Sequence, residues 1–136
     1  MRLPRHHERV QPPDDAPTRV LLDDLQDTLS KMHANRVEVG GTSRMWNRLF
    51  NHAQALHLIL RDRPDGREGI SALMASDVDT VRMSAAAWSL SWDESRARQV
   101  LRELEAGPGL AAVDAKWTLR EFDRGRLNTT WEPRRS

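Results

Sequence analysis

Carboxylates are the residues in this chain best suited to chemistry, because they recur in pairs and at turns. A pair of carboxylates brought close by a fold can serve as general acid and general base. Most of these acids, however, stand where helices are expected to begin, and there the helix dipole and N-terminal capping account for them. We therefore interpret them as structural and expect no catalytic residues. The acids considered are Asp14, Asp15, Asp23, Asp24, Asp62, Asp77, Asp79, Asp93 and Glu94.

The histidines do not have the spacing of a metal site. His52 and His57 are five positions apart in one expected helix. A zinc-binding histidine pair on a helix needs a spacing of four positions, and it also needs a third ligand. The pair His6-His7 lies in a polar N-terminal segment and would bind a metal only adventitiously. The chain has no cysteine, which removes thiolate nucleophiles and cysteine ligands. The sequence therefore predicts no metal, no cofactor and no enzymatic activity.

Arginines form three groups that would suit phosphate binding. Acidic residues are interspersed among them, and the formal net charge is only +1, whereas a nucleic-acid-binding domain usually has a one-sided basic excess. We favour solvated helix faces with local ion pairs, such as Glu103 beside Arg102 and Glu121 beside Arg124. Nucleic-acid binding through these Arg-rich faces stays the alternative function. The groups are Arg61, Arg63 and Arg67; Arg96, Arg98 and Arg102; and Arg120, Arg124 and Arg126.

Five tryptophans and no tyrosine make the aromatic composition unusual. Trp46 and Trp88 lie on apolar stripes and are expected in the core, while Trp117 lies beside a stripe and is expected to be half-exposed. Trp92 falls in a turn and Trp131 in the C-terminal tail. Exposed tryptophan is favoured at protein interfaces. For Trp92 two interpretations are equally supported: contact with a partner, or packing over the third and fifth helices.

The elements that position these residues are expected to be about six helices. Apolar residues recur three and four positions apart, most clearly in the second helix, and no segment alternates with period two. The first helix is expected from about Pro17 to Val39, and the second from a cap at Thr42 or Ser43 to about Asp62. The second stripe comprises Met45, Trp46, Leu49, Phe50, Ala53, Leu56, Ile59 and Leu60.

The four later helices are shorter, and acidic residues mark their starts. Asp65, Asp79 and Asp93 are expected to cap the third, fourth and fifth. The sixth is expected from about Leu110 to Asp123, after a break at Gly107-Pro108-Gly109. We divide the chain into a flexible arm over 1–16, a single all-α domain over 17–127 and a polar tail over 128–136. With no secretory leader and no apolar run of membrane-spanning length, the expected location is cytoplasmic.

Two helical segments resemble each other and a known repeat. The run Ala86-Ala87-Trp88-Ser89-Leu90 is echoed 29 residues later by Ala115-Lys116-Trp117-Thr118-Leu119, an offset within the range of helical repeats. The segment 77–86, with an acidic turn, Val81-Arg82 and an alanine stripe, resembles the turn and second helix of a HEAT repeat. More specifically, residues 109–127 resemble the end of an uncharacterised bacterial HEAT-like family. Residues 46–50 are similar to that family's entry to its second helix, and the resemblance covers about 20–127.

This resemblance implies both a fold and a function. The fold would be an N-terminal helical hairpin followed by two HEAT-like helix pairs, forming a fragment of a right-handed α-solenoid. Many members resemble products encoded beside polymorphic toxins, where small α-helical domains serve as immunity proteins. The implied function is therefore a non-catalytic immunity protein that occludes the active site of a cognate bacterial toxin. Such a complex needs no membrane and no nucleic acid.

Two surfaces are candidates for that contact. One is the concave face formed by the second helix of each pair, and the other is an acidic turn edge. Acidic edges suit nuclease toxins because carboxylates imitate phosphate. The residues expected to meet the partner are Asp77, Asp79, Trp92, Asp93, Glu94, Lys116, Trp117 and Arg120.

Overall fold

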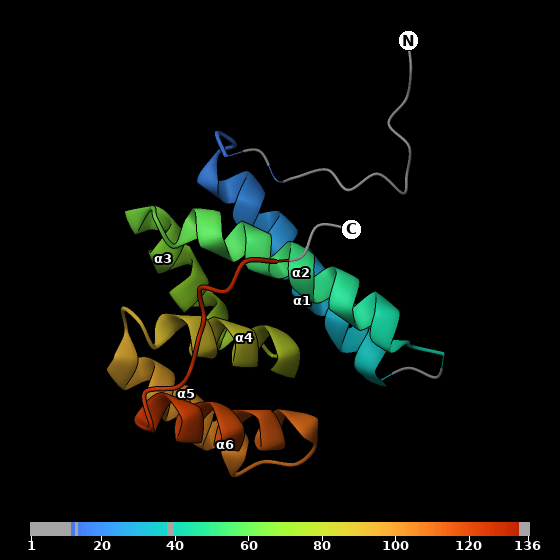
Figure 1. Ribbon diagram of the computed structural model, residues 1–136, viewed down its shortest axis with the longest axis vertical. Helices are drawn as coiled ribbons and strands as arrows, with labels where there is room; N and C mark the ends of the chain where they lie inside the picture. The colour runs from blue at the N-terminus through green and yellow to red at the C-terminus, as the bar shows by residue number, and fades with distance from the viewer. Residues whose placement is uncertain (1–11, 13, 38–39, 134–136) are drawn as a thin grey trace.

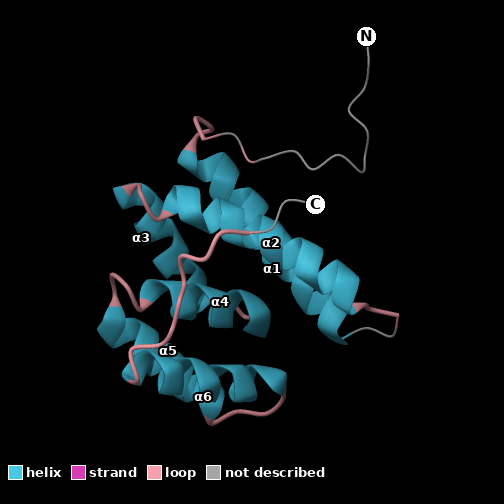
Figure 2. Ribbon diagram, in the orientation of Figure 1, coloured by secondary structure: helices cyan, strands magenta, loops and turns pink. Residues whose placement is uncertain are grey.

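The computed structural model describes residues 12, 14–37 and 40–133, and this part of the chain is entirely helical apart from its loops (Figures 1 and 2). No strand occurs in it, which confirms the predicted all-α class. The helices are α1 (Thr18–Val37), α2 (Ser43–Leu60), α3 (Pro64–Ala72), α4 (Asp79–Ser89), α5 (Glu94–Glu105) and α6 (Leu110–Asp123), with a short 3₁₀ turn, η1 (Leu73–Ala75), after α3.

Helices α1 and α2 form an antiparallel hairpin, as predicted (Figure 1). The predicted cap at Thr42 is confirmed, because its Oγ1 accepts a hydrogen bond from the Met45 N–H at 3.1 Å. Asn35, near the end of α1, fixes the turn between the helices. Its Oδ1 accepts from the Thr42 N–H and its Nδ2 donates to the Thr42 carbonyl, at 3.1 and 3.0 Å. The expected end of the first helix at Val39 lies outside the described residues.

The acidic caps predicted for α3 and α4 are wrong. Pro64 occupies the first turn of α3, so Arg63 takes the capping position and Asp65 lies inside the helix; proline at the first position is favoured because its missing N–H has no partner there anyway. In α4 the cap position is Val78, and Asp79 is already helical. Asp93 does stand at the cap position of α5, but its side chain makes no capping hydrogen bond. These first-turn acids still favour the positive end of the helix dipole.

Helix α4 occupies the centre of the fold. It packs against α1, α3, α5 and α6, and its residues Val81, Ala85, Ala86 and Trp88 are buried. Two small alanines in succession allow neighbouring helices to approach closely, while Trp88 fills the space between layers. The hairpin of α1 and α2 therefore rests on α4 through α1, and α5 and α6 cover its other side (Figure 1).

The chain beyond α6 returns to α2 as an extended segment. Gly125, with φ of +68°, ends α6: its N–H donates to the Phe122 carbonyl and the Arg126 N–H donates to the Glu121 carbonyl. This Schellman motif needs a left-handed residue, which glycine adopts without strain. Residues 127–131, here called the strap, then run across the fold to α2 (red trace in Figure 1).

The two predicted terminal segments are described only in part. Asp14 and Ala16 at the end of the N-terminal arm accept hydrogen bonds from the Arg63 guanidinium through their carbonyls. The rest of the arm, including His6-His7, and the pair Arg134-Arg135 lie outside the described residues. Within the described part of the chain, none of the helices combines the length and the apolar character needed to cross a membrane.

Candidate functional site

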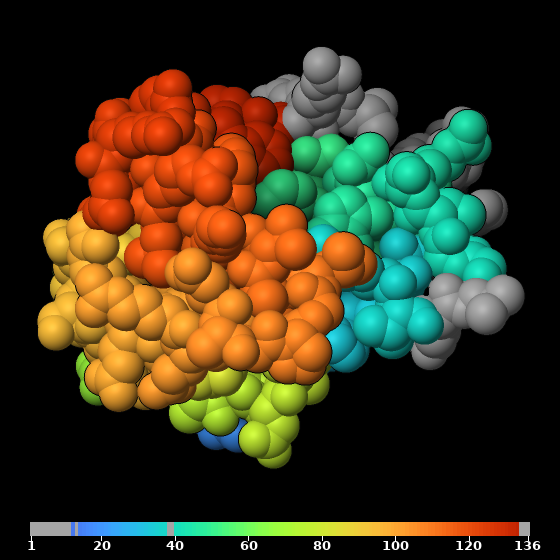
Figure 3. All heavy atoms as spheres, turned by 90° about the horizontal axis from the view of Figure 1, so that it is seen from below, coloured from blue at the N-terminus to red at the C-terminus, as the bar shows by residue number. Residues whose placement is uncertain are grey.

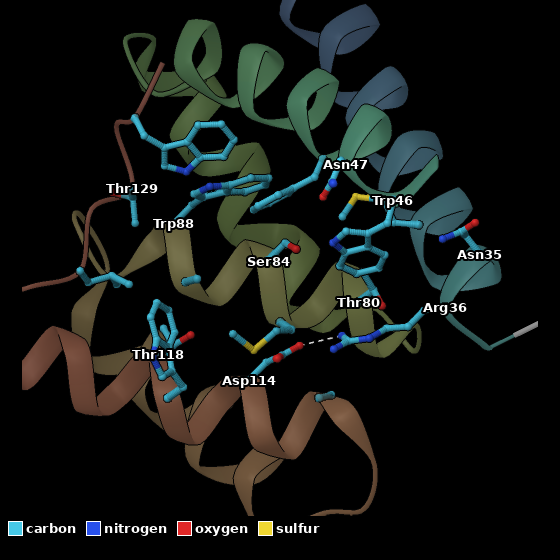
Figure 4. Close-up of a pocket in the computed structure, with 18 of the residues that line it drawn as sticks. Asn35, Arg36, Trp46, Asn47, Thr80, Ser84, Trp88, Asp114, Thr118 and Thr129 are labelled. Atoms are coloured by element: carbon cyan, nitrogen blue, oxygen red, sulfur yellow. Dashed lines mark hydrogen bonds and ion pairs between the residues drawn. The ribbon is translucent and has the colours of Figure 1, made fainter. Parts of the chain in front are cut away.

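A groove of about 960 Å³ separates the α1–α2 hairpin from α4 and α6, and the strap closes one of its sides. Figure 3 shows the face where the orange atoms of α6 meet the cyan and green atoms of the hairpin, and Figure 4 shows the lining side chains. The volume is in the range of binding sites for organic molecules or for several side chains of a partner. Its lining includes Met32, Arg36, Trp46, Asn47, Phe50, Thr80, Met83, Ser84, Trp88, Asp114, Trp117, Thr118 and, from the C-terminal segment, Arg126 to Thr129 and Trp131.

Four of the five tryptophans line this groove, each from a different element. Trp88 from α4 is only 4% exposed and forms the floor, whereas Trp117 from α6 is 55% exposed. Trp46 from α2 is half-buried, which differs from its predicted place in the core. Trp131 of the strap packs on Phe50 with ring centroids 5.3 Å apart. The groove therefore offers flat aromatic surfaces that can contact an apolar ligand from several sides.

An ion pair links the two walls of the groove. Arg36 Nη1, near the end of α1, lies 2.6 Å from Asp114 Oδ2 on α6 (Figure 4). The same guanidinium lies over the Trp46 ring, 4.9 Å from its centroid. Both partners are partly shielded from water, so the pair is screened less than a fully exposed one. It fixes the spacing between the hairpin and α6 at this point.

We expect the coupling free energy between Arg36 and Asp114 to be about 0.5–1 kcal/mol. A double-mutant cycle of Arg36→Met and Asp114→Asn, measured by urea unfolding, gives this value directly. The matched control is the exposed pair of Lys31 and Asp27 on α1, which are 2.8 Å apart and should couple more weakly, because solvent screens both charges. If the coupling free energy between Arg36 and Asp114 is no larger than that of the control pair, the ion pair does not join the two walls.

A buried polar network lies behind the aromatic floor. The His57 ring is fully buried and stacks on Trp88, with centroids 4.4 Å apart and planes 11° from parallel. Its Nδ1 lies 3.2 Å from Gln54 Oε1 and its Nε2 lies 3.0 Å from Arg61 Nη1. Because the guanidinium can only donate, Nε2 is the acceptor and the proton resides on Nδ1. Burial, with a smaller contribution from the Arg61 charge, lowers the pKa of His57 to about 3.

Trp92 packs at the outer edge of this network. Its Nε1–H donates to Ser71 Oγ at 2.9 Å, and the Arg61 guanidinium lies 5.5 Å from its ring centroid. Ser71 is also 3.3 Å from Ser89 Oγ, so the indole joins α3 to α4. Trp92 is half-buried and packs within the chain, as the second interpretation predicts, while its contact with a partner stays a prediction.

The other residues expected to bind a partner are spread over two regions. Asp77, Asp79 and Glu94 are exposed near the starts of α4 and α5, and Asp93 is half-buried between them. Glu94 is already paired with Arg98 at 2.9 Å. Lys116, Trp117 and Arg120 lie exposed on α6, and of the eight residues only Trp117 lines the groove.

Many arginines that suggested phosphate binding make contacts within the chain. Arg61 bonds to His57, Arg63 to carbonyls of the arm, and Arg67 to the Arg61 carbonyl. Arg98 pairs with both Glu94 and Asp123. Two predicted local pairings are wrong because longer-range partners are nearer: Glu103 pairs with Arg82 on α4 and Glu121 with Arg126.

Sequence reasoning missed the polar residues that shape the groove. Arg36 and Asp114 are 78 positions apart, and nothing local marks them as partners. A signal for Gln54 was present in the sequence. Gln54 and His57 stand three positions apart beside the apolar stripe of the second helix, and polar groups buried there would need hydrogen-bond partners. Both are fully buried, and every buried side-chain nitrogen and oxygen in the described residues has a hydrogen-bond partner.

No three metal-binding side chains gather at one place in the described residues. Comparison with protein-family models, curated protein sequences and solved structures found no match to this chain.

Proposed function

We propose that this chain is a non-catalytic protein-binding domain whose groove receives apolar side chains of a partner. The observation that carries the proposal is Trp117, which is 55% exposed on the edge of a groove already lined by three other tryptophans. An exposed indole beside a preformed apolar depression is typical of interface hot spots, where rigid rings fill complementary pockets. Its charged neighbours Arg36 and Asp114 neutralise each other.

The groove supports one of the two predicted surfaces more than the other. Its lining comes from α1 and from α2, α4 and α6, and the contribution of these last three, the second helices of the three expected pairs, supports the proposed concave face. The residues of the acidic turn edge do not line this groove, and part of their charge is used by the Glu94–Arg98 pair. We further propose that α3–α4 and α5–α6 are HEAT-like pairs; packing of α4 against both α5 and α6 supports this.

The most concrete partner is a bacterial toxin, for which the chain would act as an immunity protein. This identification rests on the family resemblance of residues 109–127 and 46–50. A loop beside the toxin active site would insert an apolar side chain into the groove, and the surrounding helices would block substrate. The internal contacts of Arg61, Arg63 and Arg98 favour this protein-binding function over nucleic-acid binding, which needs basic groups available for phosphates.

We expect Trp117→Ala to weaken binding to the proposed cognate toxin by at least about 30-fold, as for a hot-spot tryptophan. The measurement is titration calorimetry with the purified toxin domain. Val113→Ala is the matched control, since Val113 is 64% exposed on the same helix but does not line the groove. Equal losses of affinity in both variants would show that the groove is not part of the interface. If the unaltered chain does not bind the toxin, the toxin is not its partner.

A further inference from the structure

The strap is attached to the body of the protein by a small set of side chains. Gln54 Nε2 donates to the carbonyls of Thr129 and Trp131, both at 2.9 Å. Arg61 Nη1 lies 3.4 Å from Thr129 Oγ1, and the Trp131 ring rests on Phe50. Past Arg126, the described residues make no backbone-to-backbone hydrogen bond to any helix. The strap is therefore held by the amide of Gln54, by the Arg61–Thr129 contact, by the packing of Leu127 against the core and by one aromatic contact.

The strap has local order of its own. Asn128 Oδ1 accepts from both the N–H and the hydroxyl of Thr130, at 3.0 and 3.3 Å, which holds a turn in the middle of the segment. The left-handed Gly125 at its base has open space around it. A short segment that follows a glycine and is held farther along by a few side-chain contacts is suited to hinge at that glycine.

The strap is also a wall of the groove. Leu127, Asn128, Thr129 and Trp131 all line it, so detachment of the strap would remove one side and the Trp131 ring. The charged side chains of the lining are compensated: Arg36 by Asp114, and Arg126 by Glu121 at 2.9 Å. A neutral, aromatic lining is complementary to an uncharged apolar group, because an ionic one would lose its hydration without gaining a counter-charge.

We propose that residues 127–131 form a hinged wall, held by the Gln54 amide, that closes on an uncharged aromatic side chain inserted by a partner protein. Occupancy of the groove and attachment of the strap are then linked, so each stabilises the other. This regulation rests on the proposed function for its partner. The chemistry of the groove and the attachment of the strap are properties of this chain alone and can be measured without the partner.

The first test follows the position of the strap in the full chain. Because the chain has no cysteine, Arg48→Cys on α2 and Glu132→Cys beyond the strap give a unique pair of spin labels at exposed positions. We expect one narrow distance distribution that becomes broad in Gln54→Glu, because a carboxylate still accepts from His57 but cannot donate to the two carbonyls. Gln99→Glu, on the exposed face of α5, is the control. An unchanged distribution in Gln54→Glu overturns the clamp.

The second test measures the groove with N-acetyltryptophanamide, an uncharged blocked tryptophan, by NMR titration at millimolar concentrations. We expect binding to the unaltered chain, and binding at least about tenfold weaker in Gln54→Glu and in Trp131→Ala. Trp131→Ala keeps the Gln54 amide and the buried core, so weaker binding in this variant cannot result from a folding defect caused by Gln54→Glu. Equal affinity in all three proteins overturns the role of the strap as a wall, and no binding to the unaltered chain overturns the ligand class.

These outcomes are separate from the fate of the proposed function. If the toxin fails to bind but the blocked tryptophan binds in a strap-dependent manner, the hinged wall stands and only the partner is wrong. If the toxin binds through Trp117 while the strap variants leave both measurements unchanged, the protein-binding function stands and the hinged wall is wrong.

Discussion

Replacing Trp88 by alanine is expected to lower the free energy of unfolding by about 3–5 kcal/mol, the largest effect of any single truncation considered for this protein. Trp88 lies in the central helix α4, is 4% exposed and stacks on the buried His57 ring. The change would open a cavity next to the groove and leave the buried polar network without its apolar cover. Because marginal stability is typical of small domains, the measurement should be urea unfolding at low temperature.

The matched comparison is Trp117→Ala, which removes the same side chain from a position that is 55% exposed. Its cost should be about 0.5 kcal/mol or less, as for other exposed positions. Trp88→Phe keeps a ring against His57 and should fall between the two. If the two alanine variants lose similar stability, then Trp88 and Trp117 do not differ in burial, and the separation of core from binding surface is incorrect.

This contrast is instructive because the two tryptophans occupy equivalent places in the repeated sequence. The local pattern predicts a helix around each, and α6 begins and ends at the residues predicted, Leu110 and Asp123. Helical periodicity is a local property, so it can be read from neighbouring residues. The pattern also correctly separates a core Trp88 from a half-exposed Trp117, because only the first lies on its apolar stripe.

The starts of two helices and part of the groove were not predicted from the sequence. The caps of α3 and α4 failed because Pro64 and the turn before Val78 decide where those helices begin. In that turn Ser76 Oγ accepts from the Val78 N–H at 3.1 Å. A concave face of the second helices was predicted, but the strap and the Arg36–Asp114 pair that shape the groove were not, because they join residues far apart in the chain. Nothing in the local pattern states that α1 packs on α4 or that residue 131 returns to α2.

His57 is the other residue from which a large effect is expected, through its protonation. The ring is fully buried between Trp88, Gln54 and Arg61. Both nitrogens are already used, one as donor and one as acceptor, and a second proton would face the Arg61 guanidinium at 3.0 Å. Burial and this positive charge together lower its pKa from 6.5 to about 3, so the folded protein keeps the ring neutral.

The stability of the protein should therefore fall as the solution becomes acidic. Above pH 6.5 the ring is neutral in both states and its contribution is complete. Below that value His57 is protonated in the unfolded chain, whereas in the folded chain it stays neutral down to about pH 3. Within this window, each decrease of one pH unit lowers the free energy of unfolding by about 1.4 kcal/mol. We expect the free energy of unfolding at pH 4 to be lower than at pH 7 by about 3 kcal/mol from His57 alone.

The variant that isolates this contribution is His57→Phe, which keeps a ring on Trp88 but cannot take up a proton. It should be less stable than the unaltered chain at pH 7, because Gln54 and Arg61 lose their partner, yet its stability should depend far less on pH between 6 and 4. His52→Asn is the control, since His52 is only half-buried and lies 3.0 Å from Asp24, and it should retain the steep dependence. Urea unfolding at each pH gives the slopes. Parallel slopes for the unaltered chain and His57→Phe would mean that other groups cause the acid sensitivity, whereas a slope lost only in His57→Phe assigns it to the ring that joins the groove floor to the clamp of the strap.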